Sequence, residues 1–165
     1  MNPNTFRNLS YGVYIVSAWD KGRPCGCTAN SVMQITSSPA TIAVSLNHDN
    51  YTTGRVKDSG HFAVSILAED SPPILIGGFG FCSARDTDKF AGVESEIVAG
   101  LPVLKAGCGY IVCKVVGSME TSTHTVFLGE VIEAEPRPGT PMTYAYYHGV
   151  IKGKTAKNAP TYIKE

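Results

Sequence analysis

The sequence predicts a mainly β protein, an antiparallel Greek-key barrel with short helices in two crossovers. About seven or eight stretches alternate apolar and polar residues with the period of two that is typical of strands. Turn-forming Gly, Pro, Asn and Ser residues separate these stretches. Strands and helices do not alternate regularly, so a doubly wound α/β fold is not favoured. Closure into a barrel would remove the exposed edges of so many short strands.

The first half of the chain begins with a short helical segment and continues in strands. The Asp-Lys-Gly-Arg-Pro sequence around Gly22 has the composition of a turn, so the first two strands should form a hairpin. A bend or bulge at residues 28–30 leads into the third strand. The expected elements are the helical segment within residues 2–10 and strands at 12–19, 24–29, 30–36 and 41–46.

The strand at residues 41–46 has one bulky face and one small face. Alternation places Ile42, Val44 and Leu46 together and leaves Ala43 and Ser45 on the opposite side. The small face leaves room for a flat ligand.

The second half adds two crossover helices and further strands. Asn50 is expected to N-cap a helix through residue 57, with Gly60 as its C-cap. Ser71, followed by two prolines, is expected to N-cap another helix that runs toward residues 77–81. The remaining expected elements are strands at 61–67, 109–119, 125–135 and 144–150, with short extended pieces at 97–98 and 101–104.

Length and composition bound the possible functions. A chain of 165 residues is long enough for one domain with its own core, which we place at residues 1–151. Residues 152–165 are basic, contain a proline and have little to bury, so we expect an arm or linker there. The formal net charge of +0 gives no general attraction to nucleic acid or anionic lipid, and no apolar run is suited to a membrane span. The N-terminus lacks the pattern of a secretory signal, so we expect a cytoplasmic protein.

The cysteines and histidines do not form familiar metal or catalytic motifs. Five cysteines are an odd number, and their C-x-C and C-x4-C spacings differ from zinc knuckles, which favours reduced thiols over a metal site. The four histidines are widely separated, and each on its own fits a structural or surface role. Phosphate-loop, Rossmann and serine-hydrolase motifs are missing from the sequence.

Two polar clusters remain as candidates for a binding site. One is Thr28, Ala29, Asn30 and Ser31 at the strand bend, whose hydroxyl, amide and backbone N–H groups could hold an anion. The other lies between a strand and a helix N-terminus, where a phosphate is favoured, and it comprises Ser45, Leu46, Asn47, Asn50 and Thr52. Lys89, followed by Phe90, could add a countercharge. The alternative is that both clusters are ordinary strand ends rich in turn-forming residues.

Five motifs in register resemble the flavin reductase-like, FMN-binding split-barrel family. They are G-x-T-A-N-S-V from Gly26, S-x-P-A-T-I-A-V-S-L-N from Ser37, G-x-F-A-V-S-I-L from Gly60, D-K-F at 88–90, and His124 ahead of L-G-E-V at 128–131. The resemblance covers residues 6–147. Within the family the likeness is greatest to the flavin domains of high-molecular-weight rubredoxins, to flavoredoxins and to ferric reductases. The resemblance therefore implies an antiparallel Greek-key split β-barrel.

The resemblance also implies a cofactor and residues that would bind it. FMN would lie at a homodimer interface, with Thr28–Ser31 along the isoalloxazine edge and ribityl chain. Ser45, Leu46, Asn47, Asn50 and Thr52 would continue toward the phosphate, and Lys89 beside Phe90 would neutralise it. His124 would lie near the flavin and the nicotinamide. Family members often have Gly-Asp before this histidine, whereas this chain has Ser122-Thr123.

The function implied is an NAD(P)H:flavin or acceptor oxidoreductase. Electrons would pass from NADH or NADPH through FMN to a rubredoxin-like iron protein, a diiron flavoprotein, free flavin or ferric iron. Hydride transfer to a flavin needs stacking and orientation rather than a catalytic triad, in agreement with the motifs that are missing. The alternative is a flavoredoxin-type electron-transfer protein that does not react directly with NAD(P)H. A further alternative is a flavin-free binding protein on the same barrel.

Overall fold

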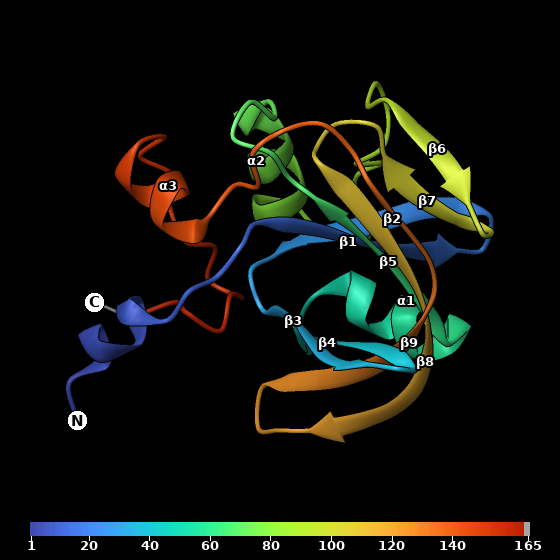
Figure 1. The fold of residues 1–165 in the computed structure, drawn as a ribbon, viewed down its shortest axis with the longest axis horizontal. Helices are drawn as coiled ribbons and strands as arrows, with labels where there is room; N and C mark the ends of the chain where they lie inside the picture. Colours follow the sequence, from blue (N-terminus) through green and yellow to red (C-terminus); the bar gives the residue numbers. More distant parts are fainter. Residues whose placement is uncertain (164–165) are drawn as a thin grey trace.

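A computed structural model describes residues 1–163 of the chain. Its main element is a seven-stranded antiparallel sheet in the order β2-β1-β5-β8-β9-β4-β3. The sheet is strongly curved, and helix α1 lies between the strands at its two ends (Figure 1). The strands are β1 Tyr14–Asp20, β2 Arg23–Ala29, β3 Val32–Ser37, β4 Ala40–Asn47, β5 His61–Ile66, β8 Gly109–Glu120 and β9 His124–Pro136.

Shorter elements complete the fold. A separate two-stranded sheet consists of β6 Ser95–Val98 and β7 Leu101–Leu104. The helices are η1 Pro3–Asn8, which is a 3-10 helix, and α1 Tyr51–Ser59, α2 Pro73–Phe81 and α3 Tyr144–Gly149. Among the described residues, every helix is too short or too polar to cross a membrane. The expected mainly antiparallel β architecture is confirmed, as is the β1–β2 hairpin.

The two edge strands of the sheet, β2 and β3, follow one another in the chain. Only Asn30 and Ser31 link them, and the strands diverge there instead of pairing. Ser31 is bonded to β4, because its Oγ donates to the Ser45 carbonyl (2.8 Å) and its carbonyl accepts from the Ser45 N–H (3.0 Å). The barrel is therefore split at this link.

The core has a cluster inside the barrel and a second one beneath α2. The inner cluster includes the fully buried Val16, Val44, Leu46, Phe62 and Phe127. The second cluster packs α2 against β1 through Ile15, Leu67, Phe79, Phe90, Leu104 and Met142.

The expected strand at residues 144–150 is wrong, because this segment forms helix α3. Thr143 caps the helix by accepting a hydrogen bond from the Tyr146 N–H (3.0 Å). Tyr144 stacks on Tyr147 with ring centroids 6.1 Å apart and meets His148 edge-on at 4.3 Å. Residues at i+3 and i+4 are neighbours on one face of a helix, and here these contacts override the β propensity of the aromatic residues.

Two expected helix caps differ from the structure in their side-chain bonds. Pro72, not Ser71, is the N-cap of α2, and the Ser71 hydroxyl instead accepts from the Ala68 N–H (2.9 Å). Asn50 is the N-cap of α1, but its side chain makes no capping bond. The expected C-cap at Gly60 is confirmed by its left-handed φ of 66°.

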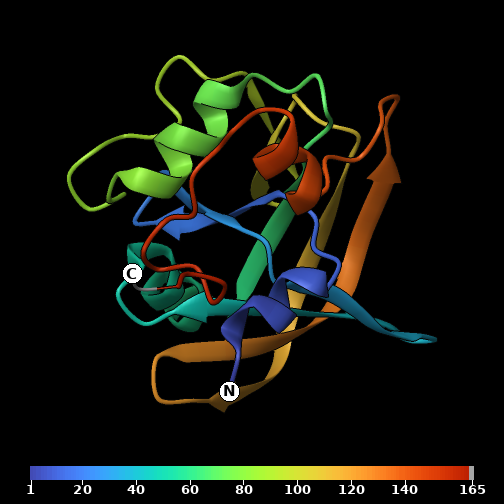
Figure 2. The ribbon, with the colours of Figure 1, turned by 90° about the vertical axis from the view of Figure 1, so that its left-hand side faces the viewer.

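The C-terminal segment packs against the domain. In Figure 2 the red segment after α3 runs down beside the sheet toward β4. Its Asn158 Nδ2 donates to Asn50 Oδ1 (2.9 Å), and Thr161 Oγ1 accepts from Asn30 Nδ2 (2.9 Å). The division at residues 151/152 stays a prediction, and residues 164–165 of the expected arm lie outside the described residues.

Gly129 on β9 offers a test of the core packing. A Cβ added there would lie 2.6 Å from Phe62 Cζ and 2.7 Å from Cys113 Cβ, and both of these residues are fully buried. We expect Gly129→Ala to lower the free energy of unfolding by about 1–3 kcal/mol, since overpacked cores shift side chains or backbone. Gly117→Ala on β8 is the control, because its Cβ would meet nothing within 4 Å. Equal melting temperatures for the two variants would contradict this packing.

Candidate functional site

A pocket that is open to solvent lies at the split of the barrel. Its walls come from the β2–β3 link, the end of β4, helices α2 and α3, and the C-terminal segment. The lining residues are Val13, Cys27, Thr28, Ala29, Asn30, Ser31, Ser45, Leu46, Asn47, Asn50, Ile76, Phe79, Gly80, Phe81, Tyr144, Tyr147, Lys154, Thr155, Ala156, Asn158, Ala159 and Pro160.

The structure brings most of the residues predicted to bind the cofactor into this one pocket. Both polar clusters contribute, and they approach each other because Ser31 is bonded to Ser45 across the split. The predicted residues that line the pocket are Thr28, Ala29, Asn30, Ser31, Ser45, Leu46, Asn47 and Asn50. Thr52, Lys89, Phe90 and His124 do not line it.

Asn30 holds the central position at the split. It is 4% exposed, and its Nδ2 donates to Thr161. Its Oδ1 is buried and has no hydrogen-bond partner among the described residues. An unpartnered buried acceptor is destabilising, so this oxygen is suited to a ligand that donates a hydrogen bond.

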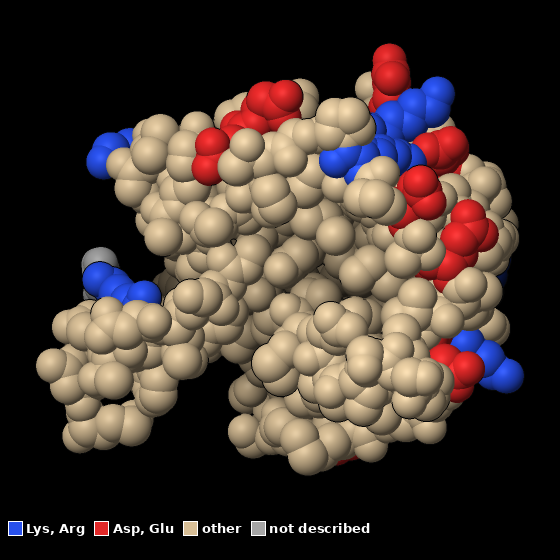
Figure 3. Space-filling model, viewed as in Figure 1, with Lys and Arg blue, Asp and Glu red and all other residues tan. Residues whose placement is uncertain are grey.

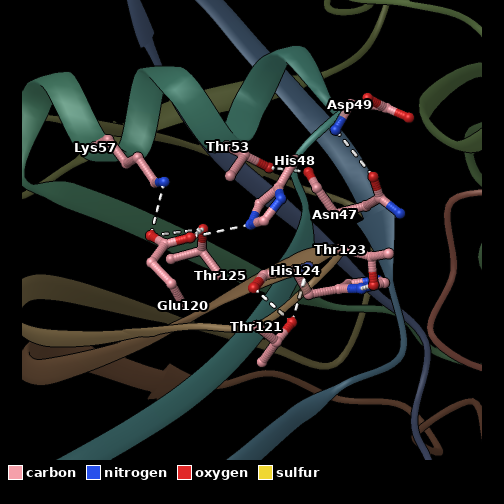
Figure 4. A network of polar contacts seen from close by, with 10 residues as sticks. All are labelled: Asn47, His48, Asp49, Thr53, Lys57, Glu120, Thr121, Thr123, His124 and Thr125. Carbon is pink, nitrogen blue, oxygen red and sulfur yellow. Dashed lines mark hydrogen bonds and ion pairs between the residues drawn. The ribbon is translucent and has the colours of Figure 1, made fainter.

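Asn47 closes the other end of the pocket with a tight turn into α1. Its Oδ1 accepts from the Asp49 N–H (2.9 Å), and its carbonyl accepts from Thr53 Oγ1 (2.6 Å). Figure 4 shows these contacts beside the base of α1. The turn fixes the start of the helix next to the pocket.

Lys89 is buried behind the pocket wall. It is 9% exposed, and its Nζ donates to the carbonyls of Gly26 (3.0 Å) and Phe79 (2.8 Å), which ties β2 to α2. Burial lowers the pKa of Lys89, and the nearby Cys27 thiol acts in the opposite direction. No carboxylate of the described residues forms an ion pair with this ammonium.

Phe90 and Thr52 support residues that line the pocket. The Phe90 ring meets Phe79 edge-on at 5.1 Å. Thr52 is 1% exposed, and its side chain acts against the burial that raises the pKa of the Cys27 thiol. Both residues therefore position the pocket wall without lining it.

His124 begins β9 directly opposite Asn47 on β4. Its Nδ1 lies 2.8 Å from Thr123 Oγ1, and its Nε2 is buried without a partner among the described residues. His124 is thus one strand away from the pocket lining, beside Asn47 (Figure 4).

The neighbouring strand ends carry a separate polar network. Glu120 accepts hydrogen bonds from Lys57 (2.8 Å) and Thr125 (3.0 Å), and it lies 3.0 Å from His48 Nε2 (Figure 4). The Lys57 bond is the main reason that the pKa of Glu120 is lowered. This network holds α1 to the β8–β9 end of the sheet.

The sequence-based list missed one whole side of the pocket. Helix α2 contributes Ile76, Phe79, Gly80 and Phe81, and the sequence analysis gave this helix no part in the site. The absent side chain of Gly80 matters, because a Cβ there would lie 3.3 Å from Thr28 Oγ1. The contributions of α3 and the C-terminal segment were also missed, since residues 144–150 were expected to be a strand and the tail an arm.

Charged side chains avoid much of the face that carries α3 and the β3–β4 pair. Figure 3 shows Lys, Arg, Asp and Glu gathered mainly at the upper and right margins, with a broad uncharged area and a hollow between. Among the described residues, no group of three or more His, Cys, Asp or Glu side chains is placed to hold a metal ion.

Comparison with known proteins identifies relatives along almost the whole chain. The family described as "Flavin reductase like domain" matches residues 6–154. The ferric-chelate reductase (NAD(P)H) of Archaeoglobus fulgidus is 42% identical, over 99% of this chain and 99% of that protein. The high molecular weight rubredoxin of Moorella thermoacetica is also 42% identical, over 98% of this chain and 72% of that protein.

Solved structures show the same fold. The NADH:FAD oxidoreductase of Streptomyces globisporus superposes with a TM-score of 0.75 at 27% identity, covering 81% of this chain and 80% of that one. A flavoredoxin from Methanosarcina acetivorans, at 23% identity and a TM-score of 0.71, covers 80% of this chain and 74% of that one.

The four buried cysteines are expected to be unreactive toward thiol reagents, and they are Cys25, Cys27, Cys108 and Cys113. Burial raises the pKa of Cys27, that of Cys25 to about 11 and that of Cys113 to about 12, and Cys82 is the exposed cysteine. Because the thiolate is the reactive form, a disulfide reagent at pH 8 should titrate one thiol per native chain and five after denaturation. Cys82→Ser should abolish the fast reaction. A fast reaction that survives in this variant would contradict the burial of the other thiols.

Proposed function

The chain belongs to the flavin reductase-like family, and from that premise we propose that it is an FMN-dependent oxidoreductase that takes electrons from NAD(P)H. The acceptor would be a rubredoxin-like iron protein, a diiron flavoprotein, free flavin or ferric iron. Two relatives support this range, since one is named a ferric-chelate reductase and the other a high molecular weight rubredoxin.

The pocket at the split of the barrel is the observation that carries the proposal. It combines apolar and aromatic walls from α2 and α3 with hydroxyl and amide groups from the β2–β3 link and β4. A flavin needs this mixture, because its ring system is flat and largely apolar while its edge and ribityl chain are polar. The buried, unpartnered Oδ1 of Asn30 supplies an acceptor for the ring edge.

The residues of the pocket then have distinct tasks. Thr28–Ser31 would hold the ring edge and ribityl chain, and Ser45, Leu46, Asn47, Asn50 and Thr52 would continue toward the phosphate. Bound FMN would supply the hydride and electron chemistry. Lys89 with Phe90 would face the phosphate, although the ammonium now bonds two carbonyls, so this role stays a prediction.

A second candidate is an electron-transfer flavoprotein that does not react directly with NAD(P)H. It is favoured by the position of His124 outside the pocket lining and by Ser122-Thr123 ahead of it. In the principal proposal, His124 orients the nicotinamide from its place beside Asn47.

The setting of the reaction is also part of the proposal. We propose that the protein is cytoplasmic and works as a homodimer with FMN at the interface. The apolar side chains exposed on the sheet fit such an assembly, and they include Met33, Met119 and Ile132. A rubredoxin-like or diiron flavoprotein would be its redox partner.

An anaerobic visible spectrum tests the reaction directly. We expect FMN-loaded protein to lose its absorption at about 450 nm rapidly when NADH or NADPH is added, since this band belongs to the oxidised cofactor. Bands that persist with both nicotinamides but vanish with dithionite would favour the electron-transfer alternative. A protein that binds no FMN would contradict both candidates and favour a flavin-free binding protein.

His124→Ala tests the nicotinamide role. We expect FMN affinity to be retained and hydride transfer to slow by about ten- to a hundredfold, because misorientation of a reactant costs rates of this order. His61→Ala is the control, since this histidine, outside the pocket lining, lies near Ser59, whose carbonyl is 2.8 Å from its Nδ1. Stopped-flow reduction rates like those of the control would remove His124 from the mechanism.

A further inference from the structure

The segment at residues 153–161, which we term the C-terminal strap, forms the outer wall of the pocket. Lys154, Thr155, Ala156, Asn158, Ala159 and Pro160 all line it. The strap is fixed to the site at two points, by Asn158 on Asn50 and by Thr161 on Asn30. These two asparagines belong to the two polar clusters, so one segment spans both ends of the candidate site.

A chain of hydrogen bonds connects the strap to helix α3 and has a defined direction. The His148 ring nitrogen Nδ1 lies 2.8 Å from the Gly153 carbonyl, which can only accept, so Nδ1 carries the hydrogen. In the neutral imidazole, Nε2 is then an acceptor for the Thr155 hydroxyl at 3.4 Å. Having donated its hydrogen, Thr155 accepts from the Tyr144 hydroxyl at 2.8 Å.

The same direction continues to the pocket. Since Tyr144 donates to Thr155, its oxygen accepts from Thr161 Oγ1 at 3.1 Å. The Thr161 hydroxyl has then used its only hydrogen, and it accepts from Asn30 Nδ2 at 2.9 Å. The amide of Asn30 accordingly lies with its nitrogen toward the strap.

This orientation leaves a buried acceptor of a pocket residue without a partner in the described part of the chain. With Nδ2 bonded to Thr161, the Oδ1 atom of Asn30 is the free end of the amide, and it is buried without a partner among the described residues. Asn30 itself lines the pocket. A ligand that offers an N–H group at this point would satisfy the buried oxygen.

We propose that Thr161 is a positioning residue that fixes the Asn30 amide so that Oδ1 accepts the imide N–H of the flavin ring. The proposal rests on the proposed function. The isoalloxazine edge carries its N3–H between two carbonyls, and it is the ring donor of the oxidised cofactor. A strap without the Thr161 hydroxyl would leave the amide free to turn, and the pocket would lose its preference for a donor at that position.

Two flavins that differ at one atom test this bond. We expect the full-length protein to bind FMN about tenfold more tightly than FMN methylated at N3, as a lost hydrogen bond of ordinary strength implies. In Thr161→Val this ratio should fall toward one, mainly through weaker binding of FMN. Thr161→Ser keeps the hydroxyl and should keep the ratio. Tyr162→Phe, which removes a hydroxyl from the next, 46% exposed residue, is the matched control.

The dissociation constants are measured anaerobically from flavin fluorescence, and melting temperatures confirm that each variant is folded. If methylation at N3 weakens binding equally in Thr161→Val and in the unaltered protein, the methyl group is excluded by steric crowding alone. That result would overturn the role of Thr161. Equal affinity of the unaltered protein for both flavins would also overturn it while leaving the proposed function intact. Failure to bind either flavin would overturn the proposed function together with this inference.

Discussion

The candidate site depends on a sheet that fails to close. Its edge strands β2 and β3 are neighbours in sequence but not in hydrogen bonding, so the chain must cross the opening through Asn30 and Ser31. The two hydrogen bonds between Ser31 and Ser45 join this link to β4. The polar residues of both clusters therefore surround one opening, although they lie about fifteen residues apart in the sequence.

Lys89 holds the opposite wall of the same opening. Its ammonium bonds one carbonyl of β2 and one of α2, and these strong charge-assisted bonds compensate for its burial. Burial lowers its pKa, and no carboxylate in the described part of the chain forms an ion pair with it. A buried positive charge near a pocket is suited to an anionic ligand, yet any phosphate contact would have to compete with or add to the carbonyl bonds. The phosphate role proposed for Lys89 would therefore draw on the same three N–H groups that hold the wall.

Most of the fold followed from local patterns in the sequence. Strict alternation located the strands, and Gly60 marked a helix end because its left-handed φ suits glycine. The two polar clusters were visible since turn-forming residues gather at strand ends. Helix α3 could not be predicted, because aromatic residues favour strands unless side-chain stacking such as that of Tyr144 on Tyr147 decides otherwise. The strap was missed for a similar reason, since its stability comes from partners far away in the sequence.

The sequence motifs alone do not account for the site, because residues far away in the sequence orient Asn30. The TANS sequence places Asn30 at the split, but the direction in which its amide points is set by residues 144–161, which lie outside the five motifs. A hydroxyl more than a hundred residues away thus decides whether the pocket presents a donor or an acceptor. The uncharged area in Figure 3 adds to this effect, because weak long-range steering leaves recognition to short-range contacts. Selectivity for a flavin would then depend on a few buried polar atoms whose orientation the strap controls.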